Sequence, residues 1–452
     1  MTRDMTTGSP LGRMLSFSVP LLIGNLFQQV YNLTDSIIVG KFIGVDAFAA
    51  VGSTGSLNFL VLGFALGICS GFSIPIAQSF GAGDTEGVRR RVGQAIWLGA
   101  GFSVLITVAA FFGTRPLLEL VKTPADIIDQ AYDYIFVIFM GVAATILYNL
   151  VSGILRALGD SRTPLLFLVF ACLLNVFLDI LFITSFHTGV AGAAYATVIA
   201  QVISGLLCIV YIRFRIPILH LSARHLRIDG PEMRRMFTAG VPMGLQFSIT
   251  AVGSILLQSA VNGLGTVAVA SVSAAVKVHL ILSAPLDTIG ITMATYCGQN
   301  LGARRADRVR EGVRRITAVA MGYSVFAFLV LYFFGTNIAQ MFIDASETEI
   351  LGNVHAFLAC NGAAYPLLSL VFIFRNSLQG LGFSNSAMFA GAAELAARVL
   401  VAFGFVRFFG FPAVCCANPT AWVFADVLLL ALYFRKIPVV EARCAQPAAA
   451  DG

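Results

Sequence analysis

The sequence predicts an all-α membrane protein with twelve transmembrane helices in two pseudo-symmetric lobes of six. Three observations carry this prediction. The 452 residues are 58% hydrophobic and only 12% charged, which is about half the charged share of a soluble domain. Twelve apolar stretches, each near the roughly 20 residues that a membrane helix needs, fill most of the chain. Finally, short motifs recur in the second half of the chain in the order in which they occur in the first half.

The twelve predicted spans are separated by short polar segments, and their ends are defined to within about 2–4 residues. They are 14–39, 49–76, 93–113, 131–154, 164–186, 189–213, 237–262, 267–296, 314–335, 353–376, 386–409 and 411–434. The first span contains several amides and Asp35. Because the apolar core of a signal peptide is uninterrupted, we expect a polar-lined first helix and no cleaved leader.

The distribution of Lys and Arg predicts the orientation. The outer segments contain only Lys41, Arg115, Lys122 and Arg407, whereas the inner segments contain most other basic residues, Arg156 among them. Cytoplasmic loops of membrane proteins carry such an excess. We therefore expect an integral protein of the inner (cytoplasmic) membrane with both termini in the cytoplasm. The same explanation accounts for the net charge of +6, so we expect no nucleic-acid partner.

The recurring motifs indicate a duplication. Ser18-Val19-Pro20 matches Gly240-Val241-Pro242, Gln78-Ser79-Phe80-Gly81-Ala82 matches Gln299-Asn300-Leu301-Gly302-Ala303, and Leu155-Arg156-Ala157-Leu158-Gly159 matches Leu378-Gln379-Gly380-Leu381-Gly382. We expect an amino-terminal lobe at 1–213, a cytoplasmic linker at 214–236, a carboxy-terminal lobe at 237–438 and a cytoplasmic tail at 439–452. Six spans in each lobe make the repeat parallel, and duplicated lobes are typical of alternating-access carriers.

Motif searches of the sequence argue against an enzyme. It contains no GxxxxGK[ST] phosphate loop, no G-x-S-x-G elbow and no HExxH motif, and its eight cysteines form no CxxC pair. We therefore expect no cofactor and no catalytic residue. Transport would have to draw its energy from an ion gradient or from a partner.

Ionisable residues inside membrane spans are functional candidates because burying them is costly. Asp35 shares a helix face with Gln28 and Tyr31, and Asp179 follows Asn175 by one turn. Their oxygens suit a hard cation such as sodium, and buried carboxylates can also carry protons. The sequence leaves the choice between the two ions open.

The second half offers a different set of charges. Glu394 and Arg398 lie four residues apart, in the order that favours an intrahelical ion pair, so a structural pair and a substrate contact are both considered. Lys277 could contact an anionic group or pair with a carboxylate.

These motifs together resemble the multidrug and toxic compound extrusion (MATE) family over about residues 10–438. The resemblance depends on the Gln28–Tyr31–Asp35 setting, the Gln78…Asp84 loop, the segment 155–164 followed by Asn175 and Asp179, and the matching motifs of the second half. It implies exchange of protons or sodium for bulky, often cationic, drugs. Carried over by position, it implies an ion-coupling set, which would also hold the metal if sodium is the ion, and a substrate pocket. The coupling set is Asp35, Asn175, Asp179 and Thr197, and the pocket positions are Gln28, Tyr31, Tyr134, Asn149 and Ser152.

The chain departs from some sodium-coupled relatives, which place acids on the seventh and tenth helices. Those helices offer only amides here, namely Gln246, Gln258, Asn262, Asn361 and Asn376, so the amino-terminal site is favoured. We expect a monomeric antiporter in the lipid bilayer that exports small organic compounds, with cationic amphiphiles favoured and with Lys277, Glu394 and Arg398 as further substrate contacts. The alternative is a flippase for a lipid-linked glycan, which would need a groove lined with cations.

Overall fold

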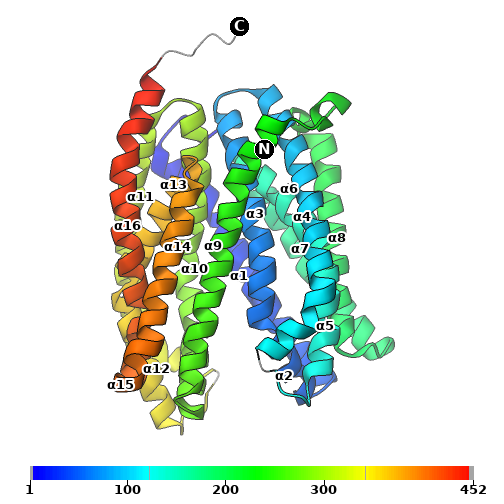
Figure 1. Cartoon of the computed structure of the whole chain (residues 1–452), viewed down its shortest axis with the longest axis vertical. Coiled ribbons are helices and arrows are strands. Elements are labelled where there is room, and N and C mark those ends of the chain that lie inside the picture. The colour runs from blue at the N-terminus through cyan, green and yellow to red at the C-terminus, as the bar shows by residue number, and fades with distance from the viewer. Residues whose placement is uncertain (1–3, 122, 342, 447–452) are drawn as a thin grey trace. The chain divides into compact units, whose positions relative to one another are not determined.

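The computed structural model describes residues 4–121, 123–341 and 343–446, so Lys122 lies outside the described residues. This part of the chain is almost entirely helical (Figure 1). In chain order the elements are α1 (Pro10–Phe42), α2 (Val45–Ser53), α3 (Gly55–Gly81), α4 (Thr85–Leu120), α5 (Ile128–Met140), α6 (Val142–Ala157), α7 (Arg162–Ile180), η1 (Leu181–Ser185), α8 (Gly189–Arg215), η2 (Pro217–Leu219), η3 (Ala223–Leu226), α9 (Gly230–Asn262), α10 (Thr266–Gly302), α11 (Ala306–Ala339), α12 (Thr348–Ala363), α13 (Tyr365–Gly380), α14 (Ser384–Val399), η4 (Leu400–Phe405), α15 (Val406–Phe409) and α16 (Phe411–Ala445).

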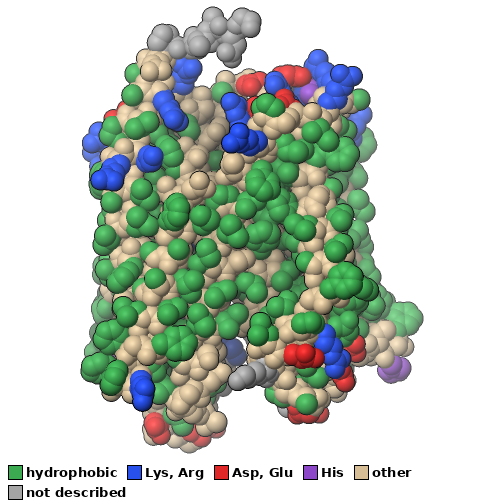
Figure 2. All heavy atoms as spheres, viewed as in Figure 1, with side chains coloured by type: hydrophobic (Ala, Val, Ile, Leu, Met, Phe, Trp, Pro, Cys, Tyr) green, Lys and Arg blue, Asp and Glu red, His purple; other side chains and the backbone are tan. Residues whose placement is uncertain are grey.

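The helices have the length and the surface of membrane spans. Within the described residues, nine are long and apolar enough to cross a membrane, and eleven are if each of two bent pairs counts as one span. The remaining predicted span is α16, with 35 residues. Large apolar side chains such as Phe112, at 73% exposed, point outward. Figure 2 shows hydrophobic side chains along the helices and Lys and Arg near helix ends. This distribution fits helices surrounded by lipid.

Two predicted spans are each built from two helices. Span 131–154 is α5 and α6, bent by 47° around Gly141, and span 353–376 is α12 and α13, bent by 50° around Ala364. A π-helical segment follows α7 and another follows α14, as η1 and η4. Since both irregularities occur at matching places in the two halves, the repeat extends from sequence motifs to backbone geometry.

The chain forms two compact units. The first is built on Val19–Ser248, and the second on Met5–Ser18 and the chain from Ile249 onward. In the first unit α6 packs on α3 and α8, and α7 packs on α8. In the second unit α13 packs on α10, and α16 packs on α14. The domain boundaries predicted from the sequence stay a prediction.

Candidate functional site

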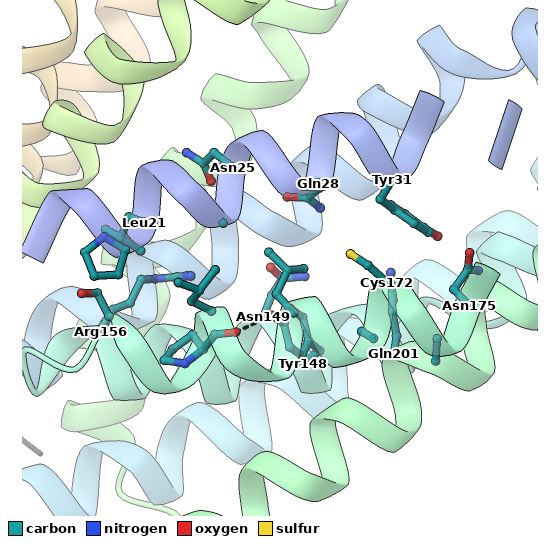
Figure 3. A pocket seen from close by; sticks show the side chains of 18 of the residues that line it. Leu21, Asn25, Gln28, Tyr31, Tyr148, Asn149, Arg156, Cys172, Asn175 and Gln201 are labelled. Carbon is teal, nitrogen blue, oxygen red and sulfur yellow. Dashed lines mark hydrogen bonds between the residues drawn. The ribbon is translucent and has the colours of Figure 1, made fainter. Parts of the chain in front are cut away.

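The first unit contains a cavity of about 110 Å³ between α1, α6, α7 and α8 (Figure 3). We call this the amino-terminal cavity. Its lining is a mixture of apolar and uncharged polar side chains with one arginine. The lining residues are Pro20, Leu21, Gly24, Asn25, Gln28, Tyr31, Tyr148, Asn149, Arg156, Ser161, Pro164, Leu165, Leu168, Ala171, Cys172, Asn175, Thr197, Ala200 and Gln201.

Helical periodicity explains why these side chains converge. On α7, Leu168, Cys172 and Asn175 follow each other at spacings of four and three, so they share one face. On α6, Asn149 and Arg156 are two turns apart on one face. Each of the helices thus contributes one face to the cavity.

Thr197 on α8 connects that helix to α1 and α7 at one end of the cavity. Its Oγ1 lies 3.0 Å from the Tyr31 hydroxyl of α1 and accepts a hydrogen bond of 3.2 Å from Nδ2 of Asn175 on α7. Figure 3 shows Tyr31 and Asn175 at the same end of the group of labelled side chains. Because hydrogen bonds fix the side chains of three separate helices, this end of the cavity has a defined geometry.

Asp35 and Asp179 lie one helical turn past Tyr31 and Asn175 and do not line the cavity. Both are buried, at 7% and 0% exposed, and their carboxyl groups interact with each other. Asp35 Oδ1 and both Asp179 oxygens have no hydrogen-bond partner among the described residues. Buried polar atoms without partners are costly. A cation or a proton placed between the two carboxyl groups would relieve this cost.

The predicted pocket residues divide into two groups. Gln28, Tyr31 and Asn149 line the cavity. Tyr134 is instead packed in an apolar cluster of the first unit, within electrostatic reach of Asp35, and Ser152 is buried beside Tyr148. Three of the five predicted positions therefore line the cavity, and Tyr134 and Ser152 do not.

The other three predicted substrate residues belong to the second unit and take no part in this cavity. Lys277 is exposed on α10. Glu394 and Arg398 are buried, and Arg398 Nη2 lies 3.4 Å from Glu394 Oε2, so the predicted intrahelical ion pair is confirmed. Glu394 is also paired with Arg375 of α13. The substrate role of these residues stays a prediction.

Arg156 lines the cavity although it was not among the predicted site residues. The predicted span ended at residue 154, whereas α6 continues to Ala157 and brings Arg156 into the cavity wall. The spacing of seven residues from Asn149 was the available signal. The assignment of Arg156 to the inner side of the membrane stays a prediction. Asn25, Tyr148, Cys172 and Gln201 also line the cavity without having been predicted as site residues.

Comparison with known proteins decides the family. A sequence model of the MatE family matches this chain twice, at residues 20–181 and at residues 242–403. The chain belongs to the MatE family. The second match begins and ends 222 residues after the first, which confirms the repeat inferred from the motifs.

Two curated proteins of Bacillus subtilis (strain 168) are similar to this MatE protein along most of their length. The probable multidrug resistance protein YoeA is 31% identical over 391 residues, and the probable multidrug resistance protein YpnP is 29% identical over 385 residues. Each alignment covers 84% of both chains. MatE proteins are membrane transporters and not enzymes, so the prediction of a non-enzyme is confirmed.

A solved structure confirms the fold. The outward-facing conformation of a multidrug resistance MATE family transporter of the MOP superfamily matches with a TM-score of 0.88, at 22% sequence identity. The match covers 97% of this chain and 98% of that one. The predicted class, an all-helical membrane protein with the twelve-helix MATE architecture, is therefore confirmed.

Proposed function

We propose that this MatE protein exports small organic compounds in exchange for protons or sodium ions, by alternating access, and that Asp35 and Asp179 form its ion-coupling site. Both Bacillus subtilis relatives are named probable multidrug resistance proteins. The observation that carries the coupling site is the buried carboxyl pair. Three of its four oxygens lack a hydrogen-bond partner among the described residues, and the pair lies one turn from the cavity lining.

Tyr31, Asn175 and Thr197 provide the physical link between ion and substrate. All three line the cavity, and Tyr31 and Asn175 are each hydrogen-bonded to Thr197. Asp35 is on the same helix as Tyr31, and Asp179 is on the same helix as Asn175. An ion between the carboxyl groups would shift the side chains that a substrate contacts. Coupling of this kind is reciprocal and typically amounts to about 1–3 kcal/mol. Ion binding from outside would thus favour substrate release there.

The coupling ion can be determined with purified protein in proteoliposomes. Proton and sodium gradients are imposed separately, and uptake of two fluorescent organic compounds, one cationic and one zwitterionic, into the vesicles is measured. We expect one gradient to drive uptake and the other to leave it at the level of protein-free vesicles. If neither gradient drives uptake of any compound tested, the antiport proposal fails.

The proposal also includes an orientation, with both termini in the cytoplasm. Arg224 in η3, Arg305 before α11 and Glu347 before α12 are exposed and lie outside the spans. Single cysteines at these positions, on a background without accessible native cysteines, report the side of the membrane. We expect an impermeant thiol reagent added to cells to label Glu347→Cys and to spare Arg224→Cys and Arg305→Cys. The reverse pattern would invert the topology.

We further propose that the chain transports as a monomer in the bilayer. Light scattering of the purified protein, corrected for bound detergent, should give the mass of one chain, 48.1 kDa. A stable mass of two chains would contradict this part of the proposal.

A further inference from the structure

Arg156 is the one charged side chain in the lining of the amino-terminal cavity, as far as the described residues show. Asp35 and Asp179 lie behind the lining, so no carboxylate faces the open volume among these residues. The guanidinium of Arg156 is half-buried and forms no hydrogen bond or ion pair within the described part of the chain. A guanidinium taken out of bulk water without a partner is costly, and an anion beside it would lower that cost.

The acidic residue that lies nearest to Arg156 in the sequence, Asp160, forms hydrogen bonds with other groups. Asp160 accepts hydrogen bonds from the backbone N–H groups of Arg162 and Thr163 at 3.1 and 3.0 Å, and its Oδ2 accepts the Thr163 hydroxyl at 2.6 Å. This carboxylate therefore caps the start of α7, and the electrostatic interactions of Arg156 are with Tyr148 and Cys69. The positive charge at this end of the cavity stays available to a ligand.

The turn after α6 does not need an arginine, because the second half of the repeat builds the same turn with glutamine. The N–H of Gly159 donates to the carbonyl of Arg156 at 2.9 Å, and the N–H of Gly382 donates to the carbonyl of Gln379 at 2.8 Å. The two glycines have φ of 79° and 85°, in the left-handed region that favours glycine. A neutral side chain at the matching position thus supports the fold, so the charge at 156 calls for another explanation.

The two ends of the cavity present different polar groups. Figure 3 shows Arg156 near Leu21 and Asn25 at one end and Asn175 and Tyr31 at the other. The amides of Gln28 and Asn149 lie on the lining between them. A volume of about 110 Å³ is smaller than the roughly 300–1,000 Å³ of a pocket for a drug-sized ligand. It suits a polar head group and not a whole amphiphile.

We propose that Arg156 binds an anionic group, a carboxylate or a phosphate, of the transported compound. A guanidinium presents parallel N–H donors that match such groups in a bidentate geometry. The cavity then selects zwitterionic or anionic compounds, in place of the purely cationic amphiphiles expected from the sequence. This inference depends on the proposed transport function and specifies its substrate class. Phosphate chemistry is shared by soluble substrates and by lipid headgroups, so the experiment distinguishes the two sources.

The test uses a fluorescent xanthene dye that carries a free carboxylate and its methyl ester, which differ only in that charge. Binding of both dyes is measured by fluorescence anisotropy with the full-length protein in neutral detergent. The variants are Arg156→Gln, which introduces the residue found in the second half, and Arg156→Lys, which keeps the charge. The matched control is Arg162→Gln, an exposed arginine of the same motif that does not line the cavity.

We expect Arg156→Gln to weaken binding of the acid dye by about tenfold or more, since hydrogen bonds to charged groups are among the stronger ones. Binding of the ester should change little. Arg156→Lys should retain part of the affinity for the acid, and Arg162→Gln should retain all of it. Equal losses for both dyes, or an equal loss in the control, would overturn the proposal. Unchanged melting temperatures verify that the variants fold.

Measurements in lipid nanodiscs identify the source of the anion. The same measurements are repeated in nanodiscs of phosphatidylcholine and of phosphatidylglycerol. If phosphatidylglycerol competes with the acid dye in the wild type but not in Arg156→Gln, a lipid phosphate occupies the same site. If it does not compete, the site serves soluble anions. Transport is scored separately. If Arg156→Gln affects both dyes equally while the wild type shows gradient-driven uptake, the anion site alone is rejected. Absence of uptake in the wild type rejects the proposed function alone.

Discussion

In the first unit, Asp35 and Asp179 face each other with three carboxylate oxygens that lack partners, whereas in the second unit Glu394 is held between Arg375 and Arg398. Asp179 on α7 and Glu394 on α14 are both buried, and the duplication relates these two helices. The first unit thus has an acidic pair that can still accept a cation or a proton. In the other, the carboxylate of Glu394 is already engaged by two guanidinium groups.

The matching positions show how the two halves diverged. At an offset of 223 residues, Asn175 corresponds to Arg398 and Asp179 corresponds to Ala402. The side chain of Arg398 packs against α9, where a Cβ at Gly253 would lie at ordinary contact distance, 3.4 Å, from its Cδ and Nη1. An arginine repels a cation at short range. The comparison therefore supports the proposed ion-coupling site in the first unit, and it shows that Glu394 and its two arginines link α13 to α14 in the second unit.

The largest effect is expected from Asp179→Asn, which tests the first half of the comparison. Asparagine is nearly isosteric but cannot take up a proton or supply the same charge to a cation. Gradient-driven export should fall to the level of protein-free proteoliposomes, while the melting temperature in detergent stays close to that of the wild type. Export at the normal rate would remove Asp179 from the coupling site.

The second prediction concerns stability and the second half of the comparison. Glu394→Gln leaves the two buried arginines without their carboxylate, and breaking a buried ion pair typically costs about 3–5 kcal/mol. Thermal unfolding in detergent should show a marked fall in the melting temperature. The control is Glu119→Gln, whose carboxylate lies 3.8 Å from Arg115 in an exposed pair and should matter little. Similar changes in melting temperature in the two variants would show that the ion pair of Glu394 does not stabilise the second unit.

A third experiment separates the two units by ion dependence. Substrate affinity is measured across pH and sodium concentration for Asp35→Asn and for Glu394→Gln. We expect Asp35→Asn to abolish the dependence, a change on the order of 1–3 kcal/mol in coupling free energy. Glu394→Gln should retain the dependence of substrate affinity on pH or sodium in the fraction of the protein that folds. The opposite result would place ion coupling in the second unit.

The smallest effect is expected at the two bends. A Cβ at Gly141 would lie 2.3 Å from Cγ2 of Val198, so Gly141→Ala forces a shift in packing that typically costs about 1–3 kcal/mol. Ala364 already carries a Cβ at the matching bend, and Ala364→Gly should therefore be milder. Unfolding midpoints of the two variants provide the measurement. A larger loss for Ala364→Gly would show that the bends are not equivalent.

Much of the fold could be predicted from the sequence because hydropathy and duplication are local properties of the chain. Apolar stretches of membrane length gave the spans, and motifs such as Gln78…Ala82 gave the repeat. The polar residues of the candidate coupling site were also found, since Asp35 and Asp179 are expensive inside membrane spans. The Glu394–Arg398 pair followed from a spacing of four on one helix.

Tertiary structure alone decided which of these groups meet. Arg375 and Glu394 are 19 residues apart on different helices, and no spacing rule predicts that a guanidinium of α13 would reach a carboxylate of α14. The bend at Gly141 likewise lies against a neighbouring helix, at Val198 of α8, and α6 continues beyond the predicted span to Ala157. Arg156 thus lies in the cavity wall, while Asp35 and Asp179 lie behind it. Hydropathy describes how much a segment avoids water, whereas the direction of each side chain is set by packing among helices that are distant in the sequence.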